Sequence, residues 1–167
     1  MSTRSQIGFY REKENPHKKF EALVYRHSDG YPEGVLTDII PFLLWWNKTR
    51  GINDLEYVSA RLLQYLCNES DLNMKNLEKQ MGKSMLSNTW DFTGIYGHGI
   101  SNAFHGDIEY FYKVYPNGLQ VYSCGFDEAP PKWKLLITID LNKEVDIKQA
   151  IKICKEVEES FEGETTK

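Results

Sequence analysis

The sequence predicts a single α+β domain, with a mainly antiparallel sheet of about five strands and helices packed on one face of that sheet. Short strand-like segments occur in pairs, and the Pro116-Asn117-Gly118 turn between two of them is typical of a β-hairpin. Segments with helical spacing of apolar residues lie between the strand pairs and at the end of the chain. The 167 residues, 41% of them hydrophobic and 13% aromatic, are enough to bury a core. We therefore expect one domain over residues 1–167, in which only the polar tail 162–167 frays.

Two strands are expected near the N-terminus, at residues 5–10 and 20–27. Because a short polar connection joins them, they should pair as an antiparallel hairpin. Two glycines, a proline and an aspartate in residues 28–34 then form a tight loop. Residues 35–48 are apolar on nearly all sides, which is typical of a buried helix, and Pro41 should kink or restart that helix.

Two further helices are expected before an irregular stretch. Leucines and a valine spaced three and four residues apart predict a helix at residues 54–68, capped by Asn53 or Asp54. A shorter helix should cover residues 71–81 and end at the glycine that follows. Residues 83–106 show no clear periodicity, so we expect irregular structure there.

Three strands are expected in the C-terminal part. Residues 107–115 alternate, which should place Ile108 on the same face as Tyr110. Residues 119–124 form the returning strand of this hairpin. Residues 132–141 alternate cleanly between apolar and polar side chains, which predicts a strand with one buried face.

The last helix should start near Asp146, which with Gln149 fits a capping box. Its apolar stripe includes Cys154, and Cys67 lies in a similar stripe of an earlier helix. Together with Cys124 these are the only cysteines, and no two of them form a CxxC pair. We expect small buried hydrophobic residues in a reducing compartment, without a cysteine-based metal site and without a cofactor.

Charge and hydropathy exclude two classes of partner. The net charge of -4 and the pI of about 5.6 argue against bulk nucleic-acid binding, because domains that coat nucleic acid are usually basic. The most apolar run, residues 35–46, is too short to span a bilayer, and no signal peptide is visible. We therefore expect a cytoplasmic protein that does not enter membranes.

Three of the four histidines lie at the edges of glycine-rich loops: His27, His98 and His105. Residues 94–107 contain two of them together with four glycines, Ser101 and Asn102. An irregular segment of this length in a compact domain is usually functional or disordered, and its aromatic residues argue against disorder. This segment is therefore the first place to look for a site.

Several kinds of chemistry are open to these residues. A metal site built from the three histidines has little support, because His98 and His105 do not have the spacing of a ligand pair. A serine nucleophile, Ser28 or Ser101, is not in a G-x-S-x-G elbow. Histidine acid–base chemistry fits better because it requires no special spacing. No phosphate-binding P-loop or dinucleotide fingerprint is present.

Two motifs near the N-terminus resemble those of a known group of proteins. Thr3-Arg4-Ser5 opens the first expected strand, and the segment from Tyr25 to Gly34, YRHSDGYPEG, closes the second. Over its first 35 residues the chain resembles a group of small uncharacterised proteins of bacteria and their phages, which carry a TRS motif and a downstream HWDGYP motif. Ser28 stands where that group usually has tryptophan. The resemblance implies a phage or mobile-element setting and no particular reaction, and it implies that one structural unit contains Arg4, Ser5, His27, Asp29, Tyr31 and Pro32.

Three functions follow as hypotheses. The first is a binding protein with a polar, aromatic-lined pocket for a small anionic or nucleotide-like ligand. Its candidate binding residues are Arg4, Ser5, Arg26, His27, Asp29, Tyr31, His98, Ser101, Asn102 and His105. The second is a histidine-dependent hydrolase or phosphodiesterase-like enzyme with catalytic His27, His98 or His105. The third is an interaction module that inhibits a host factor, with Trp45 and Trp46 as anchors for a protein partner.

The first two hypotheses share one geometric expectation. Residues 94–107 should fold back over a corner formed by Arg4, Arg26, His27 and Asp29, which would bring the three histidines into one cavity. Within that corner Asp29 could form a salt bridge with Arg4.

Overall fold

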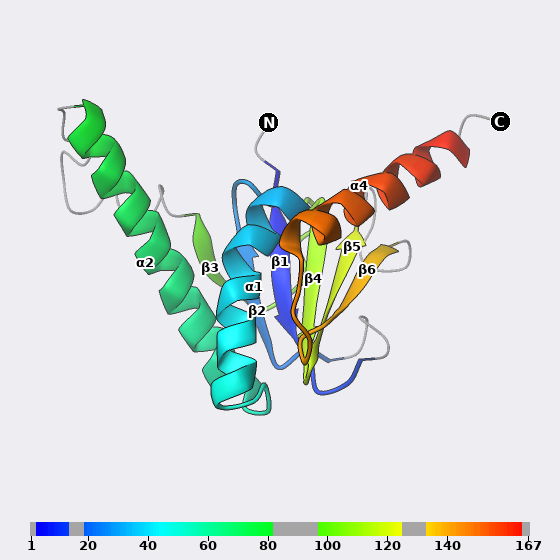
Figure 1. Cartoon of the computed structure of the whole chain (residues 1–167), viewed down its shortest axis with the longest axis horizontal. Coiled ribbons are helices and arrows are strands. Elements are labelled where there is room, and N and C mark those ends of the chain that lie inside the picture. Colours follow the sequence, from blue (N-terminus) through cyan, green and yellow to red (C-terminus); the bar gives the residue numbers. More distant parts are fainter. Residues whose placement is uncertain (1–2, 14–18, 82–96, 125–132, 165–167) are drawn as a thin grey trace.

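The computed structural model describes residues 3–13, 19–81, 97–124 and 133–164. In these ranges six strands form one sheet in the order β3-β2-β1-β4-β5-β6, and three helices lie on one face of it (Figure 1). The elements in chain order are β1 (Ser5–Phe9), β2 (Ala22–Arg26), α1 (Pro32–Thr49), α2 (Leu55–Met81), β3 (His98–Ser101), β4 (Tyr110–Tyr115), β5 (Gly118–Ser123), β6 (Lys134–Asp140) and α4 (Ile147–Glu164). The predicted α+β class is confirmed, with six strands instead of five.

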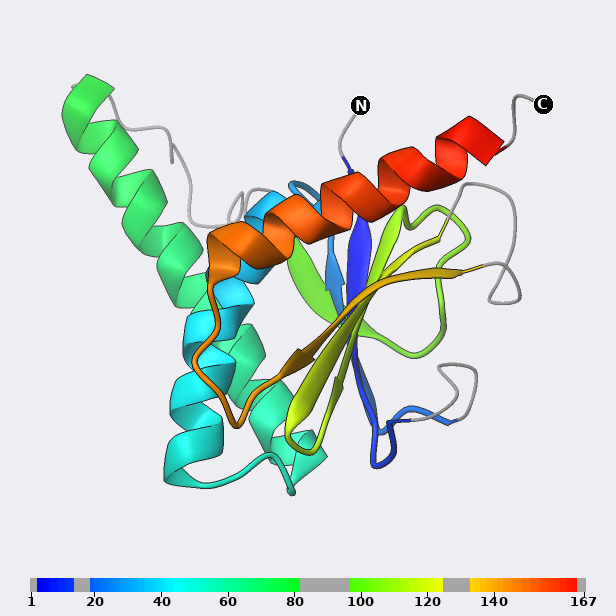
Figure 2. The ribbon, with the colours of Figure 1, turned by 45° about the vertical axis from the view of Figure 1, so that its right-hand side comes forward.

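Neighbouring strands are antiparallel in every pair except β1 and β4, which run parallel. The predicted N-terminal hairpin is confirmed as β1 and β2. The parallel pair places Ser5 beside Tyr110, so that the N-terminal hairpin and the β4–β5 hairpin share one sheet (Figure 2).

The additional strand, β3, lies in a stretch that we expected to be irregular. It pairs with β2, with His98 opposite Arg26 and Ser101 opposite Leu23. Four residues are too few to show strand periodicity, so the pairing with β2 defines this strand and its own sequence pattern does not.

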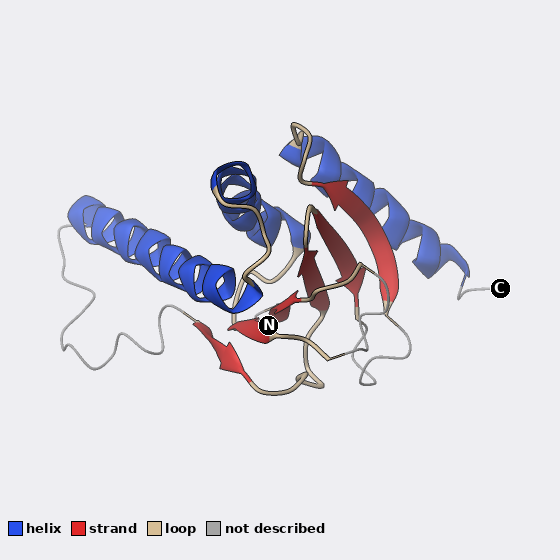
Figure 3. Cartoon of the chain, turned by 90° about the horizontal axis from the view of Figure 1, so that it is seen from below, coloured by secondary structure: helices blue, strands red, loops and turns tan. Residues whose placement is uncertain are grey.

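The helices cover a hydrophobic core on one face of the sheet, which we call the helix face (Figure 3). Ile7 and Phe9 of β1 and Tyr112 of β4 are fully buried there against α1, α2 and α4. No helix in the described part of the chain is long and apolar enough to cross a membrane.

Two helices differ from their predicted limits. α1 begins at Pro32, because a proline at the first helical position loses no hydrogen bond that the helix needs. It is not restarted at Pro41, which is exposed. α2 is one helix where two were predicted, and within it Ser70 Oγ donates to the carbonyl of Leu66, four residues earlier.

Two predicted caps are confirmed. The carboxylate of Asp54 accepts a hydrogen bond from the backbone N–H of Tyr57 (3.1 Å), and Asp146 accepts one from the N–H of Gln149 (3.0 Å). α4 continues to Glu164, so it includes the first residues of the tail that we expected to fray.

The opposite face, which we call the loop face, carries a second, mainly aromatic cluster that connecting segments cover. Its strand residues include Leu23, Phe111, Tyr115 and Tyr122, and Tyr10, Phe104, Ile108 and Trp133 come from the connections. Ile108 therefore does not share a face with Tyr110, because β4 begins only at Tyr110. The expected alternation of β6 is interrupted by a bulge, which buries Leu136 and exposes Leu135.

Candidate functional site

Most of the polar residues predicted for a site lie at one end of the sheet, where β1, β3 and β4 begin and β2 ends, whereas Ser101 and Asn102 lie at the other end of β3. Strand alternation divides them between the two faces. Arg4 and Tyr25 belong to the loop face, whereas Ser5, Arg26 and His98 belong to the helix face. The ten candidate residues therefore do not line one cavity.

A glutamine holds the segment that follows β3 against the loop face. Gln6 is fully buried, and its side-chain amide donates to the carbonyl of Ala103 (3.0 Å). Its side-chain oxygen accepts from the backbone N–H of His105 (3.1 Å). The predicted fold-back of residues 94–107 is thus found for residues 102–107, over the loop face, while 94–96 lie outside the described residues.

The fold-back creates a polar corner, which we define as Arg4, Tyr25, His27, Ser101 and His105. The rings of Tyr25 and His105 are 4.6 Å apart between centroids, with an interplanar angle of 31°. Tyr25 Oη lies 3.3 Å from His27 Nδ1, and Ser101 Oγ lies 3.2 Å from His105 Nε2. Two histidines that are far apart in the sequence therefore contact the same tyrosine (Figure 2 shows this end of the sheet).

An arginine supplies positive charge at this corner. Arg4 forms an ion pair with Asp107, whereas the sequence had suggested Asp29 as a possible partner. Both Arg4 and Asp107 are accessible to solvent. Burial raises the pKa of Tyr25, the nearby guanidinium of Arg4 lowers it, and the carboxylate of Asp107 raises it again. The corner thus combines exposed imidazole rings with a solvent-accessible guanidinium group.

Arg26 has a structural position on the helix face. It is buried, its Nε donates to the carbonyl of Ser28 (2.8 Å), and its Nη1 pairs with Asp38 of α1. His98 lies opposite Arg26 in the register and so belongs to this face. The expected convergence of the three histidines was wrong, because the sheet separates His98 from the other two.

The loop between β2 and α1 packs against the start of β1. Gly30 donates from its N–H to the carbonyl of Thr3 (3.0 Å) and accepts from the hydroxyl of Tyr112 (2.8 Å). The hydroxyl of Tyr31 donates to Asp29 (3.3 Å), and Asp29 has a positive φ of 53°. Asp29 and Tyr31 therefore shape this loop, apart from the corner, and Asn102 is exposed after the end of β3.

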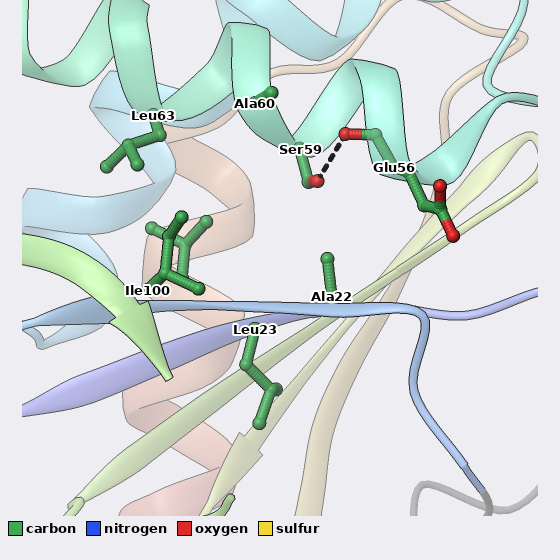
Figure 4. Close-up of a pocket in the computed structure, with 8 residues that line it drawn as sticks. Ala22, Leu23, Glu56, Ser59, Ala60, Leu63 and Ile100 are labelled. Atoms are coloured by element: carbon green, nitrogen blue, oxygen red, sulfur yellow. Dashed lines mark hydrogen bonds between the residues drawn. The ribbon is translucent and has the colours of Figure 1, made fainter. Parts of the chain in front are cut away.

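A separate apolar groove lies between α2 and the edge strand β3, with a volume of about 180 Å³ (Figure 4). Ile100 of β3, Ala22 of β2 and Leu63 of α2 line it, and 81% of the surface of Ile100 is exposed. Ser59 faces the groove and donates to the carbonyl of Glu56 (2.8 Å). The groove carries little polar surface that could fix the orientation of a ligand.

The sequence interpretation did not single out Tyr25 or Gln6, although both help to build the corner. The signal was available, because Arg4 and Gln6, like Tyr25 and His27, are two residues apart and so share a strand face. The segment that packs on these strand faces, residues 102–107, could not be predicted in the same way, because it follows no periodic pattern.

No three histidine, cysteine, aspartate or glutamate side chains gather closely enough to hold a metal ion within the described ranges. Comparison with protein-family models, with curated proteins and with solved structures finds no significant match. A function for the corner on the loop face therefore rests on the geometry of that corner alone.

Proposed function

We propose that this protein binds a small anionic ligand at the corner formed by Arg4, Tyr25, His27, Ser101 and His105. The observation that carries the proposal is the contact of two exposed histidines with Tyr25, beside the accessible guanidinium of Arg4. A guanidinium group has five N–H donors, so Arg4 can bind a ligand oxygen while it stays near Asp107.

The chemical class of ligand follows from the combination of groups. Imidazole and phenol rings provide flat surfaces against which a planar ring system can stack. Arg4 suits a phosphate or a carboxylate, because its planar fork can bind two oxygens at once. A nucleotide-like ligand offers both features, and we propose this class for the corner.

Thermal unfolding tests the proposal. Nucleoside monophosphates, diphosphates and triphosphates, with inorganic phosphate for comparison, are added to the full chain and the Tm is recorded. A ligand present at about 100 times its Kd stabilises the folded state by about 2.7 kcal/mol, so that the Tm rises.

Arg4→Ala and His105→Ala should abolish this rise. Arg11→Ala is the matched control, because Arg11 is also an exposed arginine in an ion pair, with Glu21, and lies beyond the other end of β1. The proposal fails if no compound raises the Tm, or if Arg4→Ala responds to the ligand like the wild type.

A second candidate function is histidine-dependent hydrolysis, which the distance of 3.2 Å between Ser101 Oγ and His105 Nε2 favours. Ser101 is only 8% exposed, so a substrate would reach it only after residues 102–107 move. Hydrolysis of bis(p-nitrophenyl) phosphate and of p-nitrophenyl acetate is the direct assay. Turnover that Ser101→Ala and His105→Ala both remove supports an enzyme, and activity that survives in both variants contradicts it.

A further inference from the structure

The C-terminal end of α1 and the first turns of α2 carry a continuous array of aromatic rings. The ring of Trp46 stacks on that of Phe42 (5.5 Å between centroids, 27°) and lies 5.7 Å from the ring of Tyr57 in α2. Trp45 packs edge-on against Trp46 (5.9 Å, 73°). Trp46 is buried, whereas Trp45 is 58% exposed, so the array begins inside the protein and ends in solvent.

Two arginines lie on this array. The guanidinium of Arg50 is 5.6 Å from the ring centroid of Trp46 and 5.3 Å from that of Tyr57. The guanidinium of Arg61 is 4.9 Å from the ring of Tyr57 and donates to Gln64 (2.7 Å). Neither arginine forms an ion pair with a carboxylate among the residues that the structure describes. The patch therefore presents two guanidinium groups that no carboxylate in the described part of the chain neutralises by direct contact, in a protein whose net charge is -4.

We propose that the patch formed by Trp45, Arg50, Tyr57 and Arg61 is the docking surface for an acidic segment of a partner protein. Both guanidinium groups lie over the rings and also donate to the hydroxyl of Tyr57. A guanidinium group has five N–H donors, so each arginine keeps donors with which it can bind a carboxylate. Exposed Trp45 supplies an apolar anchor beside these charges, and tryptophan and arginine are favoured residues in interfaces.

Nucleic acid fits the same patch less well. Guanidinium groups and other rings already lie against Trp46 and Tyr57, so bases could stack mainly on Trp45. Backbone binding requires a groove that neutralises several phosphates, and an acidic protein repels a long polyanion. The patch lies where α1 ends and α2 begins, away from the sheet end that carries the proposed ligand corner (Figure 1), so the two proposals are independent.

Fluorescence anisotropy with a labelled peptide of alternating glutamate and leucine tests the inference. The same peptide with glutamine in place of glutamate, and an oligodeoxythymidine of equal charge, are the comparison probes. The glutamate peptide should bind most tightly, and its affinity should fall as salt is added. Arg50→Gln and Arg61→Gln should each weaken binding by about fivefold, and Trp45→Ala should weaken it further.

Arg11→Gln removes an equal charge elsewhere on the surface and should leave binding unchanged. The lysine variants Arg50→Lys and Arg61→Lys, which keep the charge and lose the planar fork, should show intermediate affinity. Circular dichroism checks that each variant is folded. The inference is overturned if the glutamate peptide binds more weakly than about 1 mM, if the glutamine peptide or the oligonucleotide binds as tightly, or if Arg11→Gln loses as much affinity as the patch variants.

Discussion

The side chain of Gln6 in β1 and the backbone of His105 are joined by a hydrogen bond of 3.1 Å, although 99 residues separate them in the sequence. The same side chain donates to Ala103. One buried amide thus helps to hold the segment that carries His105 against the loop face.

Gln6→Ala should remove both bonds and lower the free energy of unfolding by about 2 kcal/mol, because two backbone groups lose their partner. Hydrogen exchange should show that the N–H of His105 becomes unprotected. Gln120→Ala is the control, since Gln120 is also a buried glutamine of the sheet but bonds to Tyr122 and Thr138. Unchanged protection of His105 in Gln6→Ala would contradict the role of Gln6.

The ion pair of Arg26 with Asp38 should contribute more to stability than that of Arg11 with Glu21. Arg26 is buried and also holds the carbonyl of Ser28, whereas the side chain of Arg11 is 71% exposed. Arg26→Ala should cost about 3 kcal/mol, and Arg11→Ala less than about 1 kcal/mol. Urea unfolding of both variants measures the difference. Equal losses of unfolding free energy would show that the burial of Arg26 does not add to stability.

Gly30→Ala should destabilise the protein where Gly99→Ala does not. A Cβ at Gly30 would lie 2.8 Å from the carbonyl carbon of Arg4 and 2.9 Å from the amide nitrogen of Ser5, and backbone atoms cannot move aside cheaply. We expect a loss of about 2 kcal/mol for Gly30→Ala. Nothing lies within 4 Å of a Cβ at Gly99, so Gly99→Ala should be neutral or slightly stabilising in thermal unfolding. The reverse order would contradict the packing of this loop on β1.

The free energy of unfolding should fall steeply above about pH 10. Burial raises the pKa of Tyr112 well above its ordinary value of 10.0 and that of Tyr122 to about 12, and burial with a hydrogen bond to Glu158 raises that of Tyr110. The unfolded chain therefore loses these protons first, so the stability is complete below pH 10 and is lost as the pH rises toward the folded values.

Tyr57 should behave in the opposite way in the same titration. A hydrogen bond from Arg61 and the positive charge of Arg61 lower the pKa of Tyr57, so this tyrosine should ionise first in the folded protein. Absorbance at the tyrosinate band should show an early step that Tyr57→Phe removes. Tyr31→Phe is the control, because the carboxylate of Asp29 raises the pKa of Tyr31. An early step that persists in Tyr57→Phe would contradict the contact with Arg61.

The parts of the fold that the sequence predicts well are those with a repeated local signal. The hairpin of β1 with β2 and the caps at Asp54 and Asp146 follow from local patterns, and the structure confirms them. β3 was missed because its four residues depend on pairing with β2. The predicted break in α2 was wrong, because Ser70 stays within the helix and its hydroxyl bonds to the carbonyl of Leu66.

The candidate corner shows the same limit. Alternation could have assigned Arg4 to one face and Arg26 to the other, which would have removed the expected single cavity. The contact of His105 with Tyr25 depends on a non-periodic segment that crosses the sheet, and no local pattern encodes such a crossing. The proposed ligand site therefore depends on a part of the chain that has no local sequence pattern.

The parallel pairing of β1 with β4 has a consequence for biosynthesis. β1 leaves the ribosome before the long helices α1 and α2, whereas its pairing partner β4, with Tyr110 beside Ser5, follows only after both helices have been made. Until then one edge of β1 is unpaired and can attract other strands. The large sequence separation between β1 and β4 also raises the contact order, so we expect slow folding for a domain of this size. The nascent hairpin should therefore need protection.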